Sequence, residues 1–168
     1  MKNLETPFSE ETIADLKVGD VVSISGYIYC GRDAVLPRIC KEIEAGVWEK
    51  RDIDLKGGVI FHTAVSPAGV GPTSSNKLEI ESSFETLSKA GIKLHLGKGA
   101  IKPDTVKALA DNYSVFAIIP PVTALLESQT LERECVAFPE LGMEALYRIK
   151  VENYQAIIAA AKGASIYE

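Results

Sequence analysis

The sequence predicts a mixed α/β fold, organised as one domain over residues 1–168. Strand-like runs, rich in β-branched and aromatic residues, alternate along the chain with segments of helical spacing. The length suits a single domain with a substantial core, and a composition of 46% hydrophobic and 24% charged residues is typical of a globular protein. No internal repeat, low-complexity segment or linker divides the sequence, so we expect one unit.

The first half of the chain contains two predicted strands and one longer predicted helix. Residues 21–30 and 58–62 have the composition of strands, and Gly26 within the first predicts a bulge or a close backbone contact. The spacing of apolar residues over 35–45 predicts a helix. Before these elements we expect a short arm with one helical turn, capped by Ser9.

The second half continues the alternation. We expect helices over 78–90, from Pro103 onward, in a short segment after Pro121 and over 154–163, and strands over 92–97, 114–120, 131–137 and 146–151. The strand over 114–120 is expected to be central because it has little polar character, and the one over 131–137 to lie at an edge.

The charge and the hydropathy pattern argue against nucleic acid and membrane as partners. The formal net charge is −5, whereas nucleic-acid-binding proteins usually carry a basic excess. No apolar run reaches the roughly 20 residues that cross a bilayer. The first residues are mixed and acidic, without the apolar core of a signal peptide. We therefore expect a cytoplasmic protein that binds neither nucleic acid nor membrane.

The three cysteines predict buried thiols in a reducing compartment. Cys30, Cys40 and Cys135 are odd in number, widely spaced and set in apolar or helical contexts, and no CxxC pair is present. By this reasoning the chain alone is a poor candidate for holding zinc or an iron–sulfur cluster, and we expect no metal ligand within it.

A loop rich in Gly, Pro, Ser and Thr, within residues 57–82, is the strongest candidate for a binding site. It ends at Lys77, and two other loops that follow predicted strands carry Arg32 and Lys98. In open α/β sheets ligands favour the carboxyl ends of strands, so the three cations could receive two carboxylates, with hydroxyls from Thr73 and Ser74. The alternative is that these are ordinary surface cations.

The two histidines, His62 and His95, lie in or beside predicted strands. Each is expected to be packed or hydrogen-bonded in the core more often than catalytic, although His62 borders the loop described above.

Five segments, in order and at suitable intervals, carry a family resemblance: GRDAVLPR, GPTSSNKLE, LGKGA, PPVTALLE and ELGMEALYRIKVENY. The chain resembles the β subunit, or C-terminal domain, of the class I fumarase and L-tartrate dehydratase family of iron–sulfur hydro-lyases. The resemblance implies a swivelling β/β/α domain, in three layers with a mixed sheet, like the mobile domain of aconitase.

The same resemblance implies a function shared with a second chain. This chain would be the β subunit of a class I fumarate hydratase, which hydrates fumarate reversibly to (S)-malate, and would be inactive without its α subunit. A four-iron four-sulfur cluster would be bound by the α subunit and not by this chain. The alternatives are an L-tartrate dehydratase β subunit, or a non-catalytic module that binds dicarboxylates; in isolation the chain could form a homodimer.

The resemblance also assigns roles to individual residues. Arg32 would bind a substrate carboxylate, Thr73 is the candidate catalytic base, and Lys98 would lie at the substrate site. Ser74 replaces the family's second threonine, and Lys77 stands where an arginine is expected. A lysine there keeps the positive charge but loses the bidentate geometry of a guanidinium.

A further departure lies close to Arg32. Leu36 occupies the position of a histidine in the family's GRDAAH segment.

Overall fold

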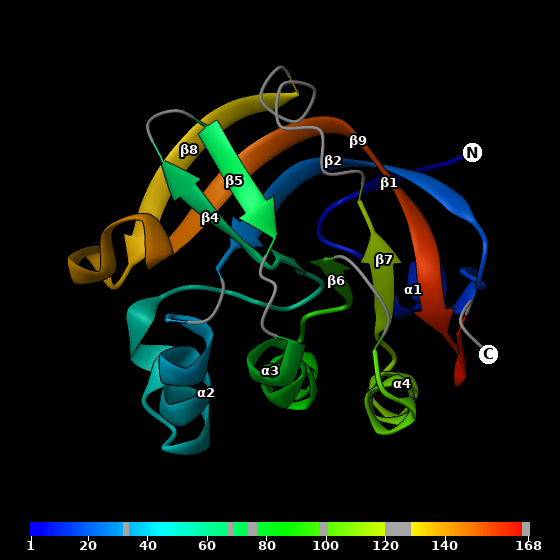
Figure 1. The fold of residues 1–168 in the computed structure, drawn as a ribbon, viewed down its shortest axis with the longest axis horizontal. Helices are drawn as coiled ribbons and strands as arrows, with labels where there is room; N and C mark the ends of the chain where they lie inside the picture. Colours follow the sequence, from blue (N-terminus) through cyan, green and yellow to red (C-terminus); the bar gives the residue numbers. More distant parts are fainter. Residues whose placement is uncertain (32–33, 67–68, 74–76, 98–100, 120–128, 166–168) are drawn as a thin grey trace.

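The computed structural model describes residues 1–31, 34–66, 69–73, 77–97, 101–119 and 129–165. The fold is a mixed α/β arrangement dominated by an eight-stranded sheet. In Figure 1, β2, β8 and β9 arch across one side of the molecule, β6 and β7 lie below them, and three helices lie beneath those strands. The expectation of an α/β fold is confirmed.

Five strands close the sheet into a ring. The strands β2 (Val21–Cys30), β3 (Val59–Phe61), β6 (Leu94–Gly97) and β7 (Val115–Ile118) are parallel neighbours in that order. The long strand β9 (Leu146–Ala161) runs antiparallel to both β7 and β2 and so joins the two ends of the row. The sheet is therefore closed, whereas the binding-site argument from sequence assumed an open one.

Three further strands extend this ring. β1 (Lys2–Glu5) pairs in parallel with β2, so the expected N-terminal arm is in fact a strand that precedes the helical turn. β8 (Thr130–Ala137) pairs with β9 alone among the described residues, which confirms the predicted edge strand. β10 (Ala164–Ser165) folds back on the end of β9.

The predicted loop within residues 57–82 contains a β-hairpin that sequence reasoning missed. β4 (Thr63–Ser66) and β5 (Gly69–Thr73) pair as a separate two-stranded antiparallel sheet. The Gly, Pro and Ser content of this stretch is typical of loops, and such residues disfavour strands. Pairing with a neighbouring segment supplies the hydrogen bonds that local propensity does not predict.

The predicted helix over 154–163 is wrong, since these residues form the second half of β9 and the turn that follows it. Four alanines and a lysine favour a helix locally. Pairing with β2 and β7 overrides this preference, because residues 154–161 supply the strand that closes the ring. Lys162 and Gly163 have φ values of 53° and 84°, which suit the tight turn of a hairpin better than a helix end.

The remaining helical predictions are confirmed within one or two residues where the structure describes them. The helices are α1 (Glu10–Ala14), α2 (Leu36–Glu44), α3 (Lys77–Lys89) and α4 (Pro103–Asp111), with short 3-10 turns η1 (Trp48–Arg51) and η2 (Pro139–Glu144). Ser9 caps α1, because its hydroxyl accepts a hydrogen bond from the Thr12 amide. The helix expected after Pro121 lies outside the described residues.

The strands of the ring separate the hydrophobic core into an inner part, enclosed by the ring, and an outer part, between the ring and the helices. Alternate residues of the ring strands, such as Ile24, Phe61 and Leu96, are fully buried in one cluster with Tyr154. Residues on the opposite face of the strands pack against the helices in two further clusters, one at α2 and α3 and one at α3 and α4. β3, β6 and β7 therefore bury both faces, as strands covered by crossover helices do, whereas β2 and β9 keep exposed residues such as Tyr27 and Ile157.

The Gly26 prediction is also confirmed. The register of β2 against β9 shifts between Ile24 and Gly26, where the backbone of Gly26 has a φ of 111°. A β-carbon at Gly26 would clash with Thr6 Oγ1. Among the described helices, none is both long and apolar enough to cross a membrane.

Candidate functional site at the carboxyl edge of the parallel strands

The parallel direction of β2, β3, β6 and β7 brings four strand ends to one edge of the ring. The helices α2, α3 and α4 each begin shortly after one of these edge segments, so their first turns lie near this edge. Free amide groups and the helix dipole make such helix starts favourable for anions. Three helix N-termini therefore lie near this edge.

The hairpin explains how Thr73 reaches this edge. β4 leads away from the end of β3, and β5 returns, so that Thr73 is the register partner of Thr63. Thr73 thus lies one strand spacing from the residue that begins β4, although ten positions separate them in sequence. Lys77 follows as the first residue of α3. The backbone places both predicted residues at the same edge.

Three other predicted site residues, Arg32, Ser74 and Lys98, lie outside the described residues. The structure fixes the residues beside two of them. The amide of Gly31 donates a hydrogen bond of 3.0 Å to Phe61 O, which ties the end of β2 to the end of β3. Gly97 ends β6 in register with Ile118. The segments that carry Arg32 and Lys98 therefore both start from this edge.

The ELGMEA segment, residues 140–145, is brought next to the hairpin. It forms most of η2, which contacts β4. Gly142 has a φ of 60°, and its carbonyl accepts a hydrogen bond of 3.3 Å from Tyr147 Oη. The hairpin that carries Thr73 therefore lies next to the ELGMEA segment.

Leu36, at the position of the family's histidine, is the first residue of α2 and is buried in the cluster at α2 and α3. Its side chain contributes to packing there.

A buried polar chain, which we call the histidine chain, lies directly behind this edge. His62 Nε2 is 3.3 Å from His95 Nδ1, and His95 Nε2 is 3.0 Å from Ser88 Oγ. Both histidines are fully buried, as expected from the sequence, and Phe84 stacks on His95 with ring centroids 4.4 Å apart. Sequence reasoning did not find the contact between the histidines, because it depends on the alignment of β3 with β6.

Burial keeps both imidazoles neutral. It lowers the pKa of His95 to about 3. The pKa of His62 is also well below its usual value, because burial and then the nearby His95 disfavour the charged form. His62 Nδ1, which is buried, has no hydrogen-bond partner among the residues that the structure describes.

The three cysteines differ in their burial. Cys30 lies in the ring interior, and burial raises the pKa of its thiol. Cys40 is part of α2 and packs in the cluster between α2 and α3. Burial and then the nearby Glu44 raise the pKa of its thiol to about 11. Cys135 is exposed on β8. Within the described ranges, no three histidine, cysteine or acidic residues gather as a metal site would require.

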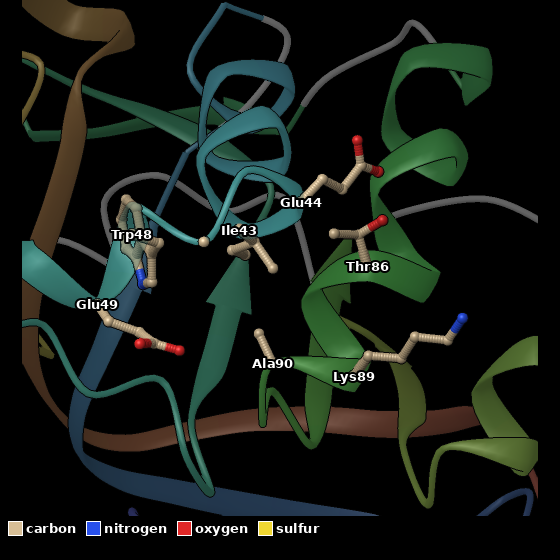
Figure 2. A pocket seen from close by; sticks show the side chains of 8 residues that line it. Ile43, Glu44, Trp48, Glu49, Thr86, Lys89 and Ala90 are labelled. Carbon is tan, nitrogen blue, oxygen red and sulfur yellow. The ribbon is translucent and has the colours of Figure 1, made fainter.

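A separate cavity of about 520 Å³ lies between the C-terminal halves of α2 and α3. Figure 2 shows Trp48 and Glu49 on one side of it and Thr86 and Lys89 of α3 on the other. Lys89 ends α3 and Lys77 begins it, and a helix of thirteen residues spans roughly 20 Å. This cavity is therefore remote from the carboxyl edge and from the predicted site.

Comparison with known proteins gives the family of the chain. A family model described as "Fumarase C-terminus" matches residues 2–168, which is nearly the whole sequence. This chain belongs to the Fumarase C-terminus family. The resemblance found in the five sequence segments is confirmed.

Members of the Fumarase C-terminus family that are similar to this chain carry two kinds of name. The L(+)-tartrate dehydratase subunit beta of Escherichia coli K12 is 33% identical over 95% of this chain and 82% of its own length. A Methanocaldococcus jannaschii protein named as the same subunit is 31% identical, over 95% of this chain and 88% of its own length. A Geobacillus stearothermophilus protein named as a class I fumarate hydratase is 30% identical over 98% of this chain. The match spans only 33% of that last protein.

Proposed function

We propose that this chain is the β subunit of a hydro-lyase that acts on a small dicarboxylic acid, with its active site shared with an α subunit. The observation that carries this proposal is the extent of the family match together with the length of the relatives. The chain matches 82% and 88% of two proteins named as β subunits, and only a third of the protein named as a class I fumarate hydratase. The remainder of the longer protein corresponds to what an α subunit would supply.

The first candidate reaction is the reversible hydration of fumarate to (S)-malate, and the second is the dehydration of L-tartrate. The name of the Geobacillus relative supports the first, and the names of the two subunits of similar length support the second. Both substrates carry two carboxylates separated by two carbons. The cation-bearing edge suits either of them.

The proposed roles follow the family resemblance of each residue. Arg32, Lys77 and Lys98 bind the two carboxylates and stabilise the negative charge that develops as a proton leaves carbon. Ser74 contributes a hydroxyl hydrogen bond to the substrate. Thr73 takes the proton; support for this role comes from its place opposite Thr63 at the carboxyl edge. A threonine hydroxyl is a weak base, so Thr73 needs a neighbour that orients or polarises it.

The four-iron four-sulfur cluster implied by the family resemblance is assigned to the α subunit. The described part of this chain does not fit a cluster, because its two buried thiols and one exposed thiol form no common site. The proposed contribution of this chain is therefore limited to substrate binding and proton transfer. We also place the protein in the cytoplasm, since its cysteines are free thiols.

We assign the fold to the swivelling β/β/α class, supported by the closed mixed sheet and the row of helices on one of its sides. A hydro-lyase subunit of this kind completes its site when it meets the α subunit. A non-catalytic module that binds dicarboxylates remains the alternative function on the same fold.

The decisive experiment mixes this chain anaerobically with the cluster-bearing α chain of the same organism and follows fumarate, (S)-malate and L-tartrate. We expect activity only in the mixture. Replacement Thr73→Ala should lower kcat by roughly 10²- to 10⁴-fold, the usual contribution of a general base, while Thr73→Ser keeps the hydroxyl and loses much less. A mixture that turns over no substrate but binds dicarboxylate would favour the non-catalytic module. Full activity of Thr73→Ala would remove Thr73 as the base.

A further inference from the structure

The cavity between the C-terminal halves of α2 and α3 is a second place where this chain can hold a ligand. Its volume of about 520 Å³ is within the range of roughly 300 to 1,000 Å³ that small-molecule pockets have. It lies at the end of α3 opposite to Lys77, so a molecule bound there leaves the carboxyl edge free for a dicarboxylate. What this cavity binds is therefore independent of the proposed function.

Part of the cavity wall is apolar. Trp48 lies on one side, and Figure 2 shows Ile43 and Ala90 between Trp48 and Thr86 of α3. Trp48 is only 5% exposed and packs in the cluster at α2 and α3, so its ring is held in place. Apolar surface of this kind favours contact with a hydrocarbon chain, because the contact removes water from both surfaces.

Two carboxylates flank this apolar surface. In Figure 2, Glu44 extends from the end of α2 toward α3, whereas Glu49 lies below Trp48 on the other side of the cavity. Both residues are exposed, and neither carboxylate has an ion-pair partner among the residues that the structure describes. A ligand that brings positive charge to each side would therefore find an unpaired carboxylate there.

The basic side chain at the cavity, that of Lys89, does not neutralise these carboxylates. Lys89 Nζ lies 2.9 Å from Glu85 Oε1, one helical turn earlier in α3, and the two side chains are 62% and 56% exposed. The charge of Lys89 is thus already paired outside the cavity lining, since Glu85 is not one of the lining residues. The charges of Glu44 and Glu49 remain uncompensated.

The ends of two helices add to the negative potential of the cavity. Glu44 is the last residue of α2, Lys89 is the last residue of α3, and both line the cavity. The carboxyl end of a helix carries the negative end of its dipole and favours a cation nearby. The two helix dipoles and the two carboxylates therefore attract positive charge together, whereas the helix N-termini, which favour anions, lie near the carboxyl edge.

We propose that this cavity binds a linear aliphatic diamine, with one ammonium group at Glu44 and the other at Glu49. The hydrocarbon chain between the two ammonium groups packs on the apolar wall. An ammonium group donates up to three hydrogen bonds, and at the Glu44 end the hydroxyl of Thr86 on the facing helix can accept one of them. A monoamine would pair with one carboxylate and leave the other unpaired, and both carboxylates would repel an anion.

The fluorescence of Trp48 tests this proposal directly, because Trp48 is the single tryptophan of the chain and lines the cavity. Titration of the full chain with cadaverine, pentylamine and pentanol compares ligands of equal chain length that carry two, one and no ammonium groups. We expect cadaverine to change the fluorescence and to bind about fivefold more tightly than pentylamine, since an exposed ion pair contributes up to about this factor. Pentanol should bind more weakly than pentylamine by a similar factor.

Four variants assign the charges. Glu44→Gln and Glu49→Gln each remove one carboxylate at nearly constant side-chain size, and each should weaken cadaverine binding about fivefold. The double variant should lose the preference for cadaverine over pentanol. Glu11→Gln makes the same charge change at an exposed position of α1, which does not line the cavity, and should leave the Kd of cadaverine unchanged. Lys89→Gln removes a positive charge from the lining and should tighten cadaverine binding about twofold.

Three results with the full chain would overturn the proposal. They are equal Kd values for cadaverine and pentanol, full binding by the double variant, and the absence of both a fluorescence change and a heat of binding with millimolar cadaverine. Calorimetry on the complex with the α chain should show that cadaverine still binds. Loss of binding in the complex would mean that the α subunit covers the cavity, and it too would overturn the proposal. A complex that is inactive on every dicarboxylate would instead refute the proposed function and leave the binding result valid.

Discussion

His62 Nε2 and His95 Nδ1 lie 3.3 Å apart in the interior of the protein, and neither ring is charged when the protein is folded. This pair makes the stability of the fold sensitive to mild acid. The two residues with ring or hydroxyl contacts to the pair in the described structure, Phe84 and Ser88, carry no charge that could compensate an imidazolium.

The first prediction is that the free energy of unfolding falls as pH decreases below about 6.5. In the unfolded chain each histidine takes up a proton near pH 6.5, whereas the folded state resists protonation down to a pH of about 3 for His95. The unfolded state therefore binds more protons in this window, and stability is lost as pH falls. Between pH 7 and pH 5.5 we expect a loss of about 1 kcal/mol for each histidine, measured by urea unfolding.

The control for this prediction is a chain in which one titrating group is removed. His95→Asn should reduce the loss between pH 7 and pH 5.5 by roughly half, whatever its effect on stability at pH 7. A free energy of unfolding that stays constant over this window in the wild type would show that the pair is not buried as described.

The second prediction concerns the close contact at Gly26. A β-carbon there would clash with Thr6 Oγ1, and the φ of 111° disfavours any side chain. Gly26→Ala should cost about 3 kcal/mol, combining backbone strain with overpacking. Gly19 has a φ of 92°, but a β-carbon at Gly19 would meet no atom within 4 Å, so Gly19→Ala should cost only about 1 kcal/mol. Equal Tm losses for the two variants would contradict the role of the Thr6 contact.

The third prediction is that one of the three thiols reacts quickly in the native protein. Cys135 is exposed, whereas Cys30 and Cys40 are buried and burial raises the pKa of both thiols. Because the thiolate is the reactive form, a thiol reagent at pH 8 should modify a single cysteine before unfolding and all three in denaturant. Cys135→Ser should abolish the fast reaction; a fast phase that survives this replacement would mean that Cys40 is accessible.

The fourth prediction concerns Arg51, which joins three short segments. Its guanidinium donates two hydrogen bonds, of 2.6 and 2.8 Å, to the Glu42 carboxylate and lies 4.3 Å from the centroid of Phe138. A lysine cannot reproduce this fork and stacking, so Arg51→Lys should lower the free energy of unfolding by about 1 kcal/mol. Thermal or urea unfolding of the variant tests this value.

The matched control for Arg51 is Arg38. Its contacts are longer, 3.6 Å to Glu140 and 5.9 Å to the same Phe138 ring, and the pair is more exposed. Exposed ion pairs of this kind contribute little, so Arg38→Lys should change stability by less than about 0.5 kcal/mol. A larger loss for Arg38→Lys than for Arg51→Lys would disagree with the geometry.

Local sequence patterns were sufficient to predict elements whose own residues favour the structure they adopt. The β-branched and aromatic run over 21–30 and the apolar spacing of α2 are of this kind, and both predictions are confirmed. The second half of β9 was mispredicted because its alanines favour a helix, while the forces that make it a strand come from β2 and β7. The β4–β5 hairpin was missed for a related reason, since its composition is that of a loop.

The candidate site shows the same division. The sequence predicted the helix that begins beside Lys77, which is confirmed, but it assigned Thr73 to a loop, whereas Thr73 ends β5. It could not show that Thr73 faces Thr63, since the register of a hairpin is not visible in composition. The contact between His62 and His95 was also beyond reach, because it joins side chains 33 positions apart through the alignment of two strands.

The long strand β9 has a consequence for how this protein is made. Its residues 147–157 pair with residues 21–30, so the strand that closes the ring is synthesised more than a hundred residues after its main partner. During translation β2 and β7 therefore expose edges that lack their β9 partner. Such edges are prone to wrong pairing with other chains. Such non-local pairing also slows folding, because the chain loses the entropy of closing a large loop before the stabilising contacts form. We expect the nascent chain to depend on holding chaperones until Ala161 has left the ribosome.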